Sequence, residues 1–149
     1  MDKIRMKTTP WFEREFKFGL PPGMLPFFQE RLSYISMRMD HRVKGMSDNR
    51  LSKKFDGKWS VKQNIGHLAD VDEIAMKRIH EMLSGKPVMS PAVFESKEDY
   101  HSMSIADVIE LFKKSRAANL EVYKRLTVAD LTKNSTASKA KDPSGLGHV

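Results

Sequence analysis

The sequence predicts an all-α fold, a small bundle of amphipathic helices, and three observations support this. Apolar residues repeat at the 3.6-residue period of an amphipathic helix in three long segments. Residues typical of helix starts and stops bound these segments, and strand signals are weak throughout the chain. We expect a single domain over residues 1–149, with an N-terminal extension (1–23), a helical bundle (24–131) and a polar tail (132–149).

The first helix is expected over residues 24–44. Residues 21–23, Pro-Pro-Gly, end the preceding loop, and Pro26 is tolerated because a helix's first turn does not need its N–H. Apolar residues at alternating steps of three and four form one stripe: Leu25, Phe28, Leu32, Ile35, Met39 and Val43.

The second helix is expected over residues 61–84. Ser60 and Gln63 have the spacing of a capping box, in which each side chain satisfies the other residue's backbone N–H. Gly85 followed by Pro87 is a typical helix stop. These signals make this helix the best bounded of the three.

The third helix is expected over residues 105–126, where Ser104 and Asp107 have a similar capping spacing. Its predicted buried face consists of Ile105, Ile109, Phe112, Leu120 and Tyr123. The long connection before it suggests a short extra helix near residues 97–100. Three antiparallel helices close a small bundle, although four would cover such wide apolar stripes better.

Composition restricts the functional classes. The chain has no cysteine, which excludes disulfides, thiolate metal sites and cysteine nucleophiles. It has no apolar run long enough to span a bilayer and no signal-peptide core, so we expect a cytoplasmic protein that does not bind a membrane. The net charge of +7 raises nucleic-acid binding as an alternative, but the basic residues are spread along helical patterns, which favours solvated faces.

Two charged residues fall on predicted buried faces. Asp72 lies within the apolar arc of the second helix, and Arg116 takes a core-facing step of the third. A buried charge is usually paired, so these residues can form an ion pair between the two helices. Alternatively, both extend to the edge of the bundle and do not meet.

His67 lies on the flank of the second helix's buried face, and Asp70 is expected further round, towards solvent. A histidine there is either a metal ligand or an ordinary packed residue. A catalytic metal normally takes three protein ligands, often from histidines three or four residues apart on a helix. The remaining histidines, His41, His80, His101 and His148, make no such pair.

Several motifs are similar to those of the DinB/YfiT-like family of metalloenzymes. They occur at Trp11–Phe16 (WFEREF), Phe18–Met24 (FGLPPGM), Glu30–Leu32 (ERL), Lys58–Val61 (KWSV) and Gly66–Asp70 (GHLAD). The third helix, with Phe112 and Arg116, also fits this family. The resemblance covers most of residues 11–131.

The resemblance implies a four-helix bundle of up-down-down-up topology with a three-histidine zinc or nickel site. The position of His67 matches the ligand on the second helix, and the family's other two ligands form a His-x-x-x-His pair on the last helix. Known members of the family include thiol transferases and hydrolases. In this chain the His-x-x-x-His pair is absent, and the residues after Leu131 read as a polar tail in place of the fourth helix.

Three functional hypotheses follow. The first is a divalent-metal-dependent hydrolase or thiol transferase acting on a small molecule, with His67 as a ligand of an incomplete site and no catalytic residue identified. It leaves open whether this chain is a shortened form of a longer protein or has lost the chemistry. The second is a non-catalytic bundle whose exposed apolar groove binds a partner helix or a second copy in a homodimer. The third is nucleic-acid binding through the positive charge.

Overall fold

The computed structural model describes residues 19–91, 98–133 and 135–137, together with residues 9, 13–15 and 17. Most of the N-terminal extension and of the polar tail therefore lies outside the described residues. The elements are η2 (Pro22–Met24), α1 (Leu25–Ser33), α2 (Ile35–Val43), α3 (Asp48–Ser52), α4 (Val61–Leu83), β1 (Val88–Met89), α5 (Ile105–Arg125), α6 (Val128–Leu131) and β2 (Thr136–Ala137).

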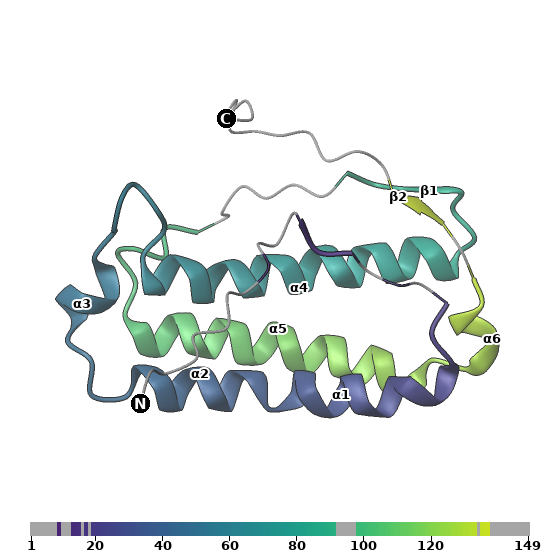
Figure 1. Cartoon of the computed structure of the whole chain (residues 1–149), viewed down its shortest axis with the longest axis horizontal. Helices are drawn as coiled ribbons and strands as arrows, with labels where there is room; N and C mark the ends of the chain where they lie inside the picture. The colour runs from purple at the N-terminus through teal and green to yellow at the C-terminus, as the bar shows by residue number, and fades with distance from the viewer. Residues whose placement is uncertain are drawn as a thin grey trace, which may run out of the picture.

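The long helices form the body of the molecule as side-by-side rods, namely α1 with α2, then α4, then α5 (Figure 1). One rod consists of α1 followed by α2, and α5 packs against it on one side and against α4 on the other. α4 and α5 run in the same direction, and α1 and α2 run opposite to both. The expectation of three antiparallel helices is therefore wrong, whereas up-down-down agrees with the order that the family resemblance implied.

The parallel arrangement of α4 and α5 explains the long connection between them. α4 has 23 residues, which at 1.5 Å per residue gives a length of about 35 Å. The chain must travel back along that length before α5 can begin beside the start of α4. Residues 98–103 in this connection form turns and bends, so the extra helix suggested there is not seen in its described part.

The boundaries of α4 and α5 follow the predicted capping signals. The Ser60 hydroxyl accepts from the Gln63 N–H, and the Gln63 side chain accepts from the Ser60 N–H, so the predicted capping box is present. Gly85, with a φ of 77°, follows the end of α4. The first predicted helix is observed as two, α1 and α2, on either side of Tyr34.

The buried apolar core lies towards the α3 end of the bundle. Its members come from the end of α2, α3, the first half of α4, the connection and the first half of α5: Val43, Leu51, Ile65, Ala69, Tyr100, Val108, Ile109 and Phe112. No residue of α1 is fully buried. The hydrophobic contacts are therefore concentrated around the start of α4.

A short strand pairing joins the segment after α4 to the segment after α6. β1 and β2 pair in parallel over two residues each, with Val88 opposite Thr136 and Met89 opposite Ala137. In the part of the chain that the structure describes, no helix combines the length and apolar character needed to cross a membrane.

Candidate metal centre

His67 lies near the start of α4, where the capping box has just set the direction of the helix. Its side chain is 21% exposed. The ring of Trp59, just before the N-cap residue, meets the imidazole edge-on at 4.7 Å between ring centroids. The imidazole is thus held on the flank of the helix, as expected, with an aromatic ring limiting its movement.

Asp70 lies one turn after His67, and its carboxylate faces the imidazole. Asp70 Oδ2 is 3.8 Å from His67 Nδ1. Asp70 is only 4% exposed, so the prediction that it points towards solvent is wrong. The helical period placed it outside the apolar arc, but the connection between α4 and α5 covers that side of α4.

Tyr100 is the residue of the connection that buries Asp70. Its hydroxyl donates to Asp70 Oδ1 at 2.6 Å, and its side chain is almost fully buried. Burial, together with the neighbouring Asp70 carboxylate, raises the pKa of the Tyr100 phenol, so it stays protonated and able to donate.

The Tyr100 ring lies directly on the backbone of α4 at Gly66. A Cβ at position 66 would lie 2.3 Å from Cγ of the Tyr100 ring, far inside van der Waals contact. Sequence reasoning did not find Tyr100. A signal was present, because an interior helix glycine costs about 1 kcal/mol relative to alanine and often marks a close approach.

The other histidines do not complete a cluster around His67. His41, His80 and His101 are exposed, and His148 lies outside the described residues. Among the residues that the structure describes, no three His, Asp or Glu side chains are grouped so that they could hold a metal ion. His67 and Asp70 are the relevant pair in this region.

Asp72 and Arg116 form the ion pair that the sequence left open. Arg116 Nε donates to Asp72 Oδ2 at 2.9 Å, and both side chains are about nine-tenths buried. Asn119 Nδ2 donates to the Asp72 backbone carbonyl at 2.9 Å, and the Arg116 guanidinium lies over the ring of Phe112. The two residues therefore join α4 to α5 and do not extend separately to the surface.

A second buried charge, Lys62, was not anticipated from the sequence. Its side chain is 3% exposed, and Nζ lies 2.6 Å from Oδ1 of Asp48 at the start of α3. The hydrogen bond from Lys62 lowers the pKa of the Asp48 carboxyl. This contact attaches α3 to the first turn of α4.

Residues 31–148 match the sequence family described as the DinB superfamily. This chain belongs to the DinB superfamily. Its structure is similar to a solved structure described as "YfiT from Bacillus subtilis is a probable metal-dependent hydrolase with an unusual four-helix bundle topology", with a TM-score of 0.71 and 17% identity. The likeness covers 80% of this chain and 71% of that one. No curated protein matches the sequence.

Membership of the DinB superfamily agrees with the predicted fold class, since the chain has the helical-bundle topology of the YfiT structure. At 17% sequence identity, the likeness shows a shared fold but does not show shared chemistry. The likeness therefore assigns no role to individual residues of this chain.

The DinB chain described here offers a partial fit to a divalent cation. His67 supplies a nitrogen donor of a type that zinc and nickel accept. The buried carboxylate of Asp70 beside Nδ1 is the kind of outer-shell partner that metal-binding histidines generally have. The described residues thus fit one ligand position and its supporting carboxylate, but not a complete ligand set.

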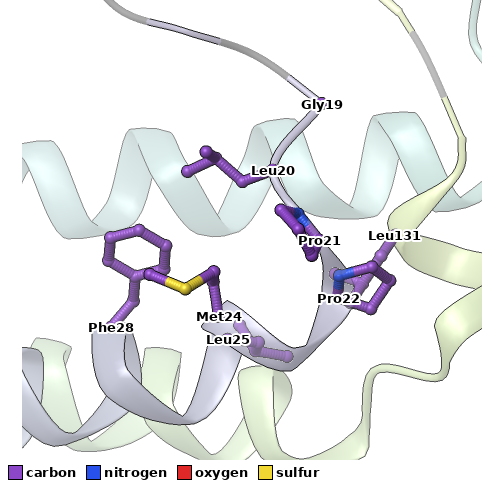
Figure 2. Close-up of a pocket in the computed structure, with 8 residues that line it drawn as sticks. All are labelled: Gly19, Leu20, Pro21, Pro22, Met24, Leu25, Phe28 and Leu131. Atoms are coloured by element: carbon purple, nitrogen blue, oxygen red, sulfur yellow. The ribbon is translucent and has the colours of Figure 1, made fainter.

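A small pocket elsewhere in this DinB bundle has no such chemistry. It measures about 180 Å³ and lies between the start of α1 and Leu131 of α6, at the end of the bundle away from α3 (Figures 1 and 2). Its lining is apolar: Gly19, Leu20, Pro21, Pro22, Met24, Leu25, Phe28 and Leu131. None of these described lining residues is titratable, so His67 and its neighbours remain the candidate site.

Proposed function

We propose that this chain is a metal-dependent hydrolase or thiol transferase of the DinB type, in which His67 binds a divalent cation such as zinc or nickel. The observation that carries the proposal is the buried Asp70 carboxylate facing Nδ1 of a half-buried histidine. A carboxylate at one ring nitrogen favours a proton there, so the other ring nitrogen is the one that binds a metal.

The residues around His67 have separate tasks in this proposal. Trp59 restricts the ring and shields one side of it from water. Asp70 Oδ2 faces Nδ1 at 3.8 Å and favours a proton there, and the Tyr100 hydroxyl donates to Asp70 Oδ1. A bound divalent cation supplies Lewis acidity that activates a water or thiol nucleophile.

Metal binding by one imidazole alone is weak, so further donors have to come from outside the described residues. His148 of this chain or of a second copy is one source. The proposal therefore predicts a modest affinity that depends on His67 before it predicts any activity.

The test is calorimetric titration of Zn²⁺ and Ni²⁺ into the purified chain and its His67→Ala variant, with metal analysis of both. His41→Ala is the matched control, because His41 is an exposed histidine on α2. We expect binding that His67→Ala abolishes and His41→Ala leaves unchanged. Equal binding by all three proteins, or by none, would overturn the proposal.

A second candidate function is self-association. Large apolar side chains of η2, α1, Tyr34 and α2 are more than a third exposed: Met24, Phe27, Phe28, Tyr34 and Met37. Phe27 and Tyr34 are seven residues apart and so lie on the same helical face. A second copy presenting the same face would cover it in a two-fold dimer.

Light scattering tests this second candidate. Phe27→Glu places a charge in the proposed interface, and Phe55→Glu does the same at an equally exposed residue outside these helices. We expect a dimer that dissociates in Phe27→Glu only. A monomeric native chain would rule the candidate out.

A further inference from the structure

We infer that Tyr100 is a positioning residue for His67, acting through Asp70. By holding one carboxylate oxygen, Tyr100 presents the other to Nδ1, which keeps the imidazole proton on Nδ1 and leaves Nε2 as the metal-binding nitrogen. The inference rests on the proposed function for its purpose, but its geometry can be tested without metal.

The two carboxylate oxygens of Asp70 face different neighbours. Oδ1 accepts from the Tyr100 hydroxyl at 2.6 Å. Oδ2 is buried and accepts no hydrogen bond from the residues that the structure describes, and it lies 3.8 Å from His67 Nδ1. Burying a carboxylate oxygen without a donor costs free energy. A proton on His67 Nδ1 that is donated to Oδ2 is therefore favoured, with the two atoms moving closer together.

The second step is the way the fold holds Tyr100. Its ring lies against Gly66, where any larger residue would collide with it. Tyr100 belongs to the connection that returns from the end of α4 to the start of α5. The connection therefore places the Tyr100 ring against Gly66, the residue just before His67.

The third step separates positioning from simple packing. If Tyr100 only fills space, Tyr100→Phe changes nothing at His67, because the ring remains on Gly66. If Tyr100 orients Asp70, loss of the hydroxyl lets the carboxylate rotate, and the imidazole loses its fixed partner. The two roles differ in the state of the imidazole and not merely in stability.

The experiment records ¹⁵N imidazole NMR spectra of the metal-free chain at a pH where histidines are neutral. His67→Gln identifies the His67 signals. We expect the Nδ1–H tautomer in the native chain. In Asp70→Asn the Tyr100 hydroxyl donates to the amide oxygen and turns the NH₂ group towards Nδ1, so the proton moves to Nε2. In Tyr100→Phe we expect a mixture of tautomers.

Tyr34→Phe is the matched control, because Tyr34 is an exposed tyrosine between α1 and α2. We expect it to retain the native spectrum. A native His67 protonated on Nε2, or a tautomer unchanged in both Asp70→Asn and Tyr100→Phe, would overturn the inference.

Zn²⁺ titration provides the second readout. Outer-shell substitutions typically weaken metal binding 10–100-fold, so we expect about that loss in Asp70→Asn and a smaller one in Tyr100→Phe. If the native chain binds no Zn²⁺ yet shows the expected tautomers, the proposed function fails and the positioning role of Tyr100 stands. If Zn²⁺ binds through His67 but the tautomers do not respond, the reverse holds.

Discussion

Arg116 shows how single residues hold this bundle together. Its guanidinium is almost fully buried, and it bonds Asp72 on the neighbouring helix while lying over the Phe112 ring. Asn119, one turn further along α5, bonds the Asp72 backbone. A buried ion pair adds little net stability compared with apolar residues, but breaking it leaves a charge without compensation.

We expect Arg116→Met to lower the free energy of unfolding by about 3–5 kcal/mol, because Asp72 would then be buried without its partner. The double variant Arg116→Met with Asp72→Leu should recover most of this loss, since it removes both charges. Urea denaturation of the single and double variants measures both effects.

Lys124→Met is the control for this prediction, because it removes an exposed ion pair with Glu121 on the same helix. Solvent-exposed pairs contribute little, so no measurable change is expected. A loss for Arg116→Met no larger than for Lys124→Met would show that the buried pair has no structural role.

Gly66 carries a second prediction about one residue. Alanine in a helix interior is normally favoured over glycine by about 1 kcal/mol. Here the added methyl would collide with Tyr100, so we expect Gly66→Ala to destabilise the chain by about 1–3 kcal/mol. In a Tyr100→Ala background the collision is gone, and the same substitution should stabilise. Thermal unfolding checks the change of sign, and an unchanged sign would contradict the observed packing.

The connection after α4 is fixed to that helix by a network of hydrogen bonds. Lys86 Nζ donates to Glu81 Oε1 at 2.9 Å, and the Ser90 N–H donates to Oε2 at 2.7 Å. The Ser90 hydroxyl donates to the same carboxylate. Glu81 thereby sets the direction in which the chain leaves α4 for the return towards α5.

This network predicts a pH dependence. The hydrogen bonds from Lys86 and Ser90 lower the pKa of Glu81 from its ordinary 4.5 to about 2. Because the folded-state pKa is depressed, its stabilisation is present above about pH 4.5 and is lost as the pH falls towards 2. We expect the native chain to lose more stability than Glu81→Gln between pH 5 and pH 2, measured by urea denaturation. Parallel curves for the two proteins would contradict this.

The whole bundle is packed unevenly along its length. Leu51, Val108 and Phe112 are almost inaccessible to solvent near α3, whereas no residue of α1 is fully buried. Local opening costs least where few apolar contacts must be broken. The α1 end should therefore open more readily than the end that contains His67.

Amide hydrogen exchange tests this difference. We expect backbone amides at 65–69 of α4 and 108–112 of α5 to exchange far more slowly than those in the interior of α1. Uniform protection along all three rods would show that the bundle opens only as one unit.

Particular residues show how much of the structure could be predicted from the sequence. Sequence patterns predicted the N-caps at Ser60 and Ser104 and the helices that follow them. Capping hydrogen bonds and the helical repeat of apolar residues both involve residues within a few positions of each other. The flank position of His67 followed from the same period. Asp72 and Arg116 were identified as a possible pair, because both are charges on apolar faces.

The sequence alone determined the starts of α4 and α5 and most of their apolar faces, because these depend on interactions along a few turns of chain. Only the tertiary structure decided that the connection returns Tyr100 to Gly66 and that Asp70 is buried beside His67. These contacts join residues about 30 positions apart, and no local period records where a returning loop will lie.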